Sequence, residues 1–438
     1  MNTEGPADEQ PVGPFLVGLA AALNAAEFPV DEVQRRVEAV GQANGAGSVS
    51  TSAFPTFVMV SLAGGEPVTL QVTAAAGRSP RLDRIDAIER LADDAARGAI
   101  DPAGGLARLD EIVAMPHRFG RAASVFGYAV LTTGICLVLR PARDEVLAAA
   151  VLGMVVGLMD LASRRPSPLR VLMPVAAAFC VALACGLVAR AGWLDPGIRA
   201  IVASLVVFLP GATLTTAVVE LGSGQTVSGA SRLVSGALAL GMLAFGILAG
   251  LQVAGLKPHE LAGLPDQLGA WAPWLGVVIF AAGVMVTHSA PGRSGAGLAV
   301  VLVAAWCGQL AGNAVGGAYV GAFLGAVVLV LASTLVARWP GAMAAHAAFL
   351  PGFWLLVPGA MGLIGLTRWA GSAGVLRVDD LVATVGSIFA VAVGVLFGAQ
   401  LWAWMLLTGK AVEGASATVS NRTSRFRTRS ARHKDRRS

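Results

Sequence analysis

The chain has 438 residues, of which 55% are hydrophobic and only 13% are charged, and its mean hydropathy is +0.69. Soluble proteins carry roughly a quarter charged residues, so this composition excludes an ordinary soluble globular protein of this length.

Charge is concentrated at the two ends of the chain. Residues 1–119 hold sixteen acidic and nine basic side chains, a net charge of −7, whereas residues 421–438 hold one acidic and eight basic, a net charge of +7. The segment between them is nearly uncharged for its length, which is typical of a membrane-embedded region. The polar start of the chain lacks the features of a secretory signal peptide, so we expect the first 119 residues to stay in the cytoplasm.

A disordered segment over residues 1–13 is predicted to precede a small α+β cytoplasmic domain over residues 14–117. Apolar residues recur at helical spacing on one face of the third expected helix, with charges on the other side. Strand patterns at 57–62 and 68–72 are joined by a Gly-Gly turn. The expected helices cover residues 14–25, 29–44, about 82–91 and about 102–115.

From residue 120 onward the sequence consists of long apolar runs. A helix of about 20 residues crosses roughly 30 Å of hydrocarbon, and ten runs approach that length. The seventh run is short and has a polar exit at Gln309–Asn313, so it is also a candidate for a broken or re-entrant segment. The ten runs lie near 121–139, 145–162, 171–190, 198–220, 230–255, 272–290, 295–311, 316–337, 344–366 and 380–407.

These runs predict an α-helical polytopic membrane protein of about ten transmembrane helices. We expect two membrane halves of five helices each, over residues 118–262 and 263–410, and a basic disordered cytoplasmic tail over 411–438. An even number of spans places both termini on one side. The positive charge of the tail and of the segment before the first span favours the cytoplasm for both, with the body in the inner (plasma) membrane.

Small residues four apart allow helix backbones to approach closely, and several glycine series have this spacing. The four cysteines lie in apolar runs without a CxxC or metal-ligand spacing, so we interpret them as packing residues and predict neither a metal site nor a cofactor. The glycine series are Gly153/Gly157, Gly246/Gly250, Gly317/Gly321/Gly325 and Gly394/Gly398, and the cysteines are Cys136, Cys180, Cys185 and Cys307.

A tetrapeptide, Phe-Leu-Pro-Gly, occurs twice, at residues 208–211 in the fourth run and at residues 349–352 in the ninth. The two runs are the fourth members of two sets of five. Because five is an odd number, the second set enters the membrane with the opposite orientation to the first. The match therefore predicts inverted repeats, whose substrate sites lie where helices are interrupted. Two ordinary proline kinks are the alternative interpretation.

Hydroxyl and proline residues near the two repeats are the candidate substrate-binding group. Thr213, Thr216 and Glu220 have the spacing of one helix face, and the two hydroxyls could bind a substrate or bond their own i−4 carbonyls. Pro358-Gly359 follows the second repeat by seven residues, on the same helical face. The candidates are Pro210, Gly211, Thr213, Thr216, Pro351, Gly352, Pro358 and Gly359.

Three titratable residues are candidates for proton coupling. Glu220 is ionisable within an apolar run, and such groups are functional hypotheses by default, although an ion pair with Arg232 is its alternative role. Asp160 has the same ambiguity beside Arg164 and Arg165. His346 is the third candidate because the ordinary pKa of a histidine side chain lies near neutral pH, and its alternative is an ordinary residue of the membrane boundary.

At these residues the sequence resembles the threonine/serine exporter family, in its fused form with a soluble domain and two membrane halves. The likeness extends over about residues 14–408, and its most distinctive part is the double Pro-Gly motif of the second half. The stretches that carry it are Glu32-Val33, Ser52–Thr56, Leu82–Ile85, Leu109–Ile112, Leu209–Gly211, Glu220, Gly229, Arg232-Leu233, Leu350–Gly352 and Leu356–Gly359.

The resemblance implies export of L-threonine and L-serine from the cytoplasm, driven by the proton motive force. Some relatives exist as two separate proteins, one per half, and are linked to dicarboxylate export, so a small dicarboxylate such as succinate is the alternative substrate. The resemblance also implies a soluble domain followed by ten helices.

The amino-terminal domain carries no recognisable enzyme motif. It has one histidine, no cysteine, no nucleotide-binding loop and no hydrolase signature, so we do not expect an enzyme. A sensor or regulatory role for the domain stays open, as does homo-oligomerisation. The basic tail has a single aromatic residue, Phe426, which favours contact with anionic membrane lipids over nucleic acid.

Overall fold

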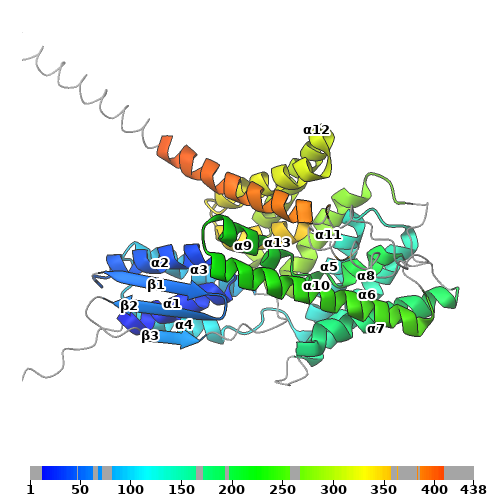
Figure 1. Ribbon diagram of the computed structural model, residues 1–438, viewed down its shortest axis with the longest axis horizontal. Coiled ribbons are helices and arrows are strands. Elements are labelled where there is room, and N and C mark those ends of the chain that lie inside the picture. The colour runs from blue at the N-terminus through cyan, green and yellow to red at the C-terminus, as the bar shows by residue number, and fades with distance from the viewer. Residues whose placement is uncertain are drawn as a thin grey trace, which may run out of the picture.

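The computed structural model describes residues 12–46, 48–62, 68–71, 81–163, 171–192, 197–256, 267–356, 363, 382 and 385–408 (Figure 1). An α+β domain lies at one end of the molecule and a body of apolar helices extends from it. The domain contains α1 (Val12–Ala25), α2 (Val30–Ala43), β1 (Val49–Phe54), β2 (Phe57–Leu62), β3 (Val68–Gln71), α3 (Leu82–Ala96) and α4 (Pro102–Ala114).

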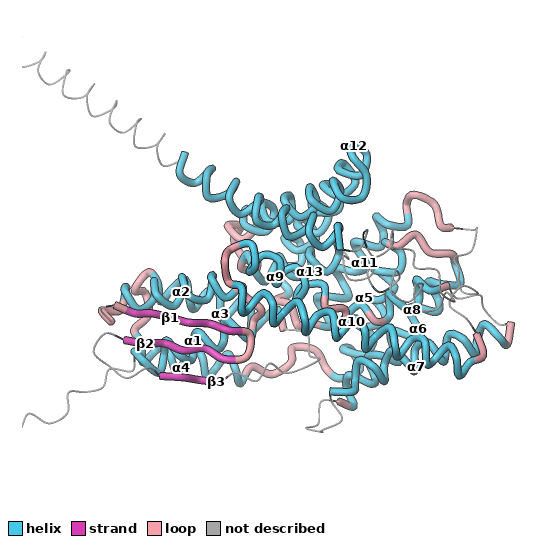
Figure 2. The backbone as a smooth tube through the Cα atoms, viewed as in Figure 1, coloured by secondary structure: helices cyan, strands magenta, loops and turns pink. Residues whose placement is uncertain are grey.

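The three strands form one antiparallel sheet in the order β1-β2-β3, with helices packed on it (Figure 2). Helix α1 is apolar on all sides, as expected of a helix at the centre of a core, and Phe15, Leu16 and Leu19 are fully buried. The predicted helices and two strands are confirmed. β1 was not expected, because its sequence VSTSAF is rich in hydroxyl residues, and it pairs along its full length with β2. The Gly-Gly turn lies outside the described residues.

The membrane body is built from helices that follow most of the predicted apolar runs. Six of the described helices are long and apolar enough to cross a membrane, or seven if the bent pair within residues 198–222 forms one span. The predicted count of ten stays a prediction. The helices are α5 (Arg121–Val138), α6 (Arg143–Ala162), α7 (Met173–Arg190), α8 (Ile198–Ser204), α9 (Gly211–Gly222), α10 (Thr226–Ala254), α11 (Ala272–Thr287), α12 (Gly295–Val336), α13 (Ala345–Leu356) and Val385–Thr408.

Helix α12 contains two antiparallel arms. Its backbone leaves helical geometry at Gly316 and Gly317, where Gly317 has φ +78° and ψ −166°. A methyl group on Gly308 would lie 2.9 Å from Val328, and one on Gly297 would lie 2.9 Å from Val336, so the arms pack side by side. The seventh predicted run is therefore a continuous arm that extends through its polar exit to the Gly316 turn, a few residues beyond the end expected near residue 311.

The predicted glycine contacts are confirmed where helices approach most closely. Gly153 of α6 packs against Thr132 of α5, and a methyl group on Gly246 of α10 would lie 2.7 Å from the carbonyl oxygen of Val175 on α7. A larger side chain at either position would separate the helices.

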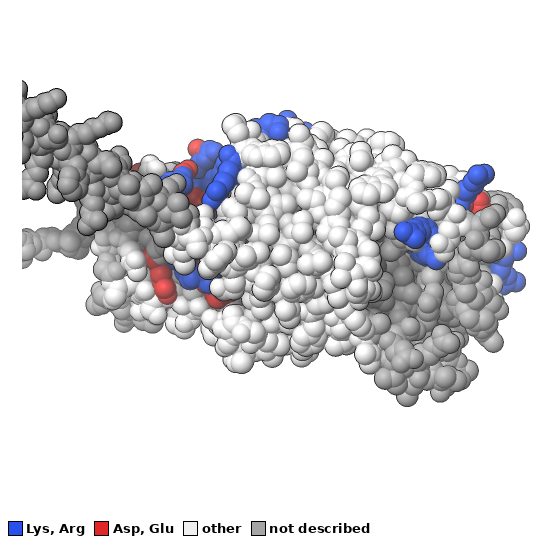
Figure 3. Space-filling model, turned by 90° about the horizontal axis from the view of Figure 1, so that it is seen from above, with Lys and Arg blue, Asp and Glu red and all other residues white. Residues whose placement is uncertain are grey.

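Charged side chains gather toward the ends of the molecule and leave the middle of the body almost uncharged on the face shown in Figure 3. We call the end of the body that contacts the amino-terminal domain the domain end; α9 ends there and α13 begins there. The opposite end, where α6 and α8 begin, is the far end (Figure 1). Helix α5 starts beside the domain and has 18 residues, so the far end lies about 27 Å away along its axis.

Candidate functional site

The first Phe-Leu-Pro-Gly sequence forms a break between two helices. Helix α8 ends at Ser204, a 3₁₀ turn covers Val206–Phe208, and α9 starts at Gly211. The segment Val206–Gly222 is bent by 57° relative to Ile198–Ser204. Leu209 is extended, with φ −68° and ψ 126°, because the proline ring disfavours helical geometry in the residue before it. The predicted interruption at Pro210 and Gly211 is confirmed.

The second Phe-Leu-Pro-Gly sequence lies within a continuous helix. Pro351 is inside α13, which runs from Ala345 to Leu356 without a break at the proline, so the interruption predicted there was wrong. The helix is held on both sides of the proline by packing, and a Cβ added at Gly352 would clash with Leu329 of α12. Pro358 and Gly359 lie outside the described residues.

The two helices that carry the repeated sequence contact each other. Helix α9 ends at the domain end and α13 begins there, so they run in opposite directions. Thr213 and Thr216 of α9 are half-buried, and within the described part of the chain neither hydroxyl forms a hydrogen bond. The i−4 carbonyl bond, which Ser204 forms with Ala200 at 2.7 Å, is therefore not made by these two threonines. Their hydroxyl groups are available to a ligand.

Glu220, at the end of α9, is fully buried and bonded through both carboxylate oxygens. Arg232 Nε of α10 donates to Oε1 at 3.1 Å and to Oε2 at 3.2 Å, and the backbone N–H of Val30 donates to Oε1 at 3.1 Å. The ion-pair alternative is thus observed. Val30 is the first residue of α2, so Glu220 also places a negative charge at the amino terminus of a helix in the domain.

Two carboxylates of the domain bind the amino terminus of α13 in the same manner. Asp86 of α3 accepts a 2.7 Å hydrogen bond from the backbone N–H of Ala344, and Glu89 accepts one at 3.0 Å from that of His346. The first N–H groups of a helix have no partner within the helix, so these carboxylates satisfy them. Burial raises the pKa of Glu89 to about 7, against the opposing effect of Arg36 nearby.

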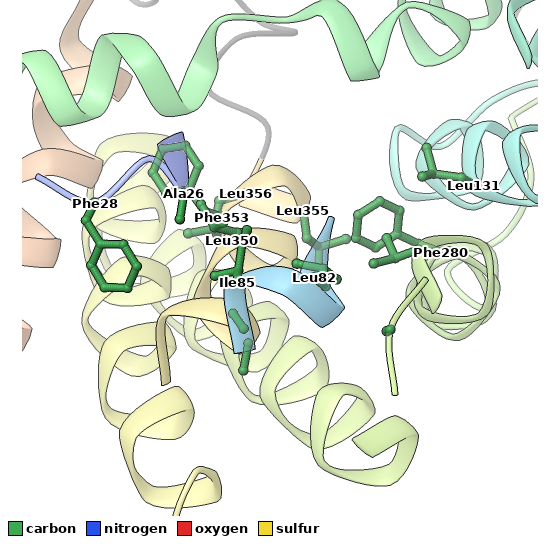
Figure 4. Close-up of a cluster of buried hydrophobic side chains, with 14 of the residues drawn as sticks. Ala26, Phe28, Leu82, Ile85, Leu131, Phe280, Leu350, Phe353, Leu355 and Leu356 are labelled. Atoms are coloured by element: carbon green, nitrogen blue, oxygen red, sulfur yellow. The ribbon is translucent and has the colours of Figure 1, made fainter. Parts of the chain in front are cut away.

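His346 lies between α13 and the domain. Its Nε2 atom is 3.2 Å from the carbonyl oxygen of Ala26, and its ring stacks on Phe28 with 3.8 Å between centroids. Around it, apolar side chains of the domain and of α13 form one continuous core, in which Leu82 and Ile85 lie beside Leu350 and Leu355 (Figure 4). The structure therefore makes His346 a docking residue, and its predicted role in proton coupling stays a prediction.

Asp160 lies near the end of α6, and its carbonyl accepts a 2.8 Å hydrogen bond from the Ser163 hydroxyl. Arg164 and Arg165, its proposed partners, lie outside the described residues. His288, at the end of α11, is 3% exposed, and within the described residues neither ring nitrogen has a hydrogen-bond partner. Its carbonyl accepts a 3.0 Å bond from the N–H of Leu82, which places it at the domain end.

Sequence reasoning missed Asp86 and Glu89, which it placed on the solvent side of their helix. Each follows a residue of the apolar stripe by four positions, Leu82 and Ile85 respectively, and so shares its face. It also missed Glu145 of α6. The sequence feature that could have identified this residue is an acidic side chain at the start of an apolar run. In the described part of the chain, no three His, Cys, Asp or Glu side chains are arranged to hold a metal ion.

Six or seven helices long and apolar enough to cross a membrane, with an α+β domain bonded to one end of a broken helix, are consistent with a multi-pass membrane protein. The family model of threonine/serine exporters, ThrE, matches residues 14–254, which is more than half of the chain. The chain therefore belongs to the threonine/serine exporter family. The match covers the domain and the body as far as the end of α10. No curated protein and no solved structure is detectably similar to the chain.

Proposed function

We propose that the protein is a secondary active transporter that exports L-threonine and L-serine from the cytoplasm, and that its substrate binds between α9 and α13. The observation that carries this proposal is the pair of unbonded hydroxyls, Thr213 and Thr216, one turn and two turns beyond the break at Pro210, on a helix that contacts α13. Backbone groups released at the break would bind the ammonium and carboxylate groups of the substrate, and a threonine hydroxyl would bind its side chain.

The proposed arrangement has two inverted halves. Helices α9 and α13 carry the same tetrapeptide and run in opposite directions relative to the domain, as corresponding helices of inverted repeats do. The halves differ in that only the first tetrapeptide breaks its helix. This difference supports a state in which one half is open at its break and the other is closed.

The domain end is assigned to the cytoplasm, in the inner membrane, with both termini on that side. The positive charge of residues 421–438 and of the segment before α5 supports this orientation. The domain contacts the ends of both α9 and α13. In the proposed orientation it would therefore cover the cytoplasmic end of the pathway. We propose that the proton motive force drives export, with Glu220, Asp160 and His346 as the candidate coupling residues identified by sequence.

Transport by the purified full-length protein in proteoliposomes tests this function. Labelled threonine, serine and succinate are loaded separately, and their release is measured with and without a proton gradient. We expect gradient-dependent release of threonine and serine. Release of succinate alone would instead support the dicarboxylate alternative, and release that ignores the gradient would contradict proton coupling.

A further inference from the structure

The far end of the body contains a second buried ion pair, which involves the other half of the broken helix. Glu145 of α6 is 0% exposed, and Arg199 of α8 lies with Nη1 3.4 Å from its Oε2 atom. Helix α8 precedes the break and α9 follows it, so each half of this span is held by one buried carboxylate–arginine pair, one at each end of the body. Figure 1 places α6 and α8 at the end away from the domain.

The two pairs differ in how well the carboxylate is satisfied. Glu220 has donors on both oxygens, including the arginine Nε at 3.1 and 3.2 Å. Glu145 accepts a 2.8 Å bond from the backbone N–H of Ala142 and a long 3.4 Å bond from Arg199, both at Oε2. Its Oε1 atom is buried and has no partner among the described residues. An unpaired carboxylate oxygen in a buried site costs free energy that a bound proton removes.

From this contrast we infer that Glu145 is a proton-binding residue of the transport cycle, with Arg199 as its counter-ion. A proton from the aqueous phase at the far end binds the carboxylate at Oε1, the carboxylate becomes neutral, and its attraction for Arg199 is lost. The α6–α8 contact then loosens, which opens the outer half of the broken span. The inference rests on the proposed function for its role in transport, but the proton site itself does not depend on the substrate.

Among the described residues, few other titratable groups lie near Glu145. Its backbone carbonyl accepts a 3.5 Å hydrogen bond from the Cys136 thiol of α5, and Cys185 of α7 lies within electrostatic reach. On α6 itself, Arg143 is exposed and Asp144 is half-buried. His288 lies at the domain end and cannot exchange protons with the far end directly. A Cβ added at Gly197, just before α8, would clash with Glu145 Oε1.

The buried thiols of Cys136 and Cys185 report on opening of this region. In full-length protein carrying Cys180→Ser and Cys307→Ser, reconstituted in proteoliposomes, labelling by a membrane-impermeant maleimide is measured at one fixed pH near 7. Glu145→Gln, which mimics the protonated carboxyl, should increase the labelling rate at least about tenfold, because breaking a buried ion pair costs several kcal/mol. Gly197→Ala should act in the same direction by displacing the carboxylate. Arg143→Gln, a charge change on the exposed side of the same helix, should leave the rate unchanged.

Efflux supplies the second readout. Wild-type efflux should depend on the pH of the solution at the far end of the body, and Glu145→Gln should remove that dependence. Labelling of Glu145→Gln and Gly197→Ala at the wild-type rate would overturn the proton site. Absence of threonine and serine efflux from the wild type, with faster labelling of the variants, would instead contradict the proposed substrate and leave the proton site supported.

Discussion

The carboxylate of Glu220 accepts a 3.1 Å hydrogen bond from the backbone N–H of Val30, although the two residues are 190 positions apart in the sequence. The body thereby caps a helix of the domain, while Asp86 and Glu89 of the domain cap α13 of the body. This exchange fixes the domain against the ends of the two helices that carry the repeated tetrapeptide. A movement of α9 relative to α13 must therefore change the contacts of the domain, which links domain docking to the state of the pathway.

Glu220→Ala should strongly destabilise the protein. It would leave Arg232 buried without its counter-ion and Val30 without its acceptor, and losing one partner of a buried pair costs about 3–5 kcal/mol. The measurement is thermal unfolding in detergent at neutral pH. Arg232→Ala in the same chain should restore part of the loss, because it removes the unpaired charge. Equal and additive losses from the two substitutions would show that the pair contributes no coupling energy.

Glu89 should make docking of the domain depend on pH. Burial raises its pKa to about 7 from an ordinary value of 4.5, so it binds a proton more readily in the folded protein than in the unfolded chain. The contribution of Glu89 to the free energy of unfolding is then complete below about pH 4.5 and is lost as the pH rises through about 7. This contribution is at most roughly 3 kcal/mol. Thermal unfolding between pH 5 and 8, at intervals of half a unit, measures the change.

The Glu89→Gln variant should flatten this pH profile, because glutamine can still accept from the N–H of His346 but does not titrate. Asp94→Asn is the matched control, since Asp94 lies on the same helix with an exposed ion pair to Arg97. The control should keep the wild-type profile. A wild-type profile in Glu89→Gln would assign the pH dependence to another group.

Removing the hydroxyls of α9 should weaken substrate binding. Thr213→Val and Thr216→Val keep the shape of the side chain and remove the hydroxyl that is proposed to bond the substrate. Such a hydrogen bond is worth about 1 kcal/mol, so each variant should raise the KM for threonine roughly fivefold. The control is Thr133→Val on α5, whose hydroxyl already bonds the Ala129 carbonyl at 2.7 Å. Unchanged KM values in both α9 variants would move the substrate site elsewhere.

Sequence predicted the elements well because their signals are local. The periodicity of α1 to α4 and the apolar runs of α5 to α10 set the position of each helix within a few residues, and the proline at position 210 marked the break. β1 was not predicted because its hydroxyl-rich sequence is compatible with both a strand and a loop. Pro351 was misjudged because the same four residues break one helix and lie within another, so the tetrapeptide alone does not determine whether a helix is interrupted.

The candidate site was predicted only where its residues share one helix. Thr213, Thr216 and Glu220 follow one face, which spacing reveals. Val30, which donates to Glu220, and Ala344, which donates to Asp86, lie across the domain boundary from these carboxylates, 190 and 258 residues away in the sequence, and no local pattern encodes such a contact. For this reason Asp86 and Glu89 were assigned to the solvent side of their helix.

Pro210→Ala and Pro351→Ala should have unequal effects on transport. Alanine at position 210 restores an N–H and favours helix through the break, so efflux should fall at least about tenfold while the protein remains folded. Alanine at position 351 changes a helix that is already continuous, so efflux should fall less than threefold. Efflux of labelled threonine, with thermal unfolding as the folding control, compares them. Equal loss in both variants would indicate that α13 also opens at its proline during transport.

The turn between the two arms of α12 should require glycine at position 317. Its backbone, at φ +78° and ψ −166°, lies in a region that only glycine adopts readily, although no other atom would lie within 4 Å of a Cβ added there. Gly317→Ala should therefore destabilise the protein by about 1–3 kcal/mol through backbone strain alone. Gly241→Ala on α10 is the matched control, because Gly241 is also free of neighbours within 4 Å but lies in regular helix, where alanine is favoured. Thermal unfolding should place Gly317→Ala below the wild type and Gly241→Ala at or above it. A Gly317→Ala variant as stable as the wild type would mean that the two arms can be joined by ordinary helix, and that their antiparallel packing is not fixed by this turn.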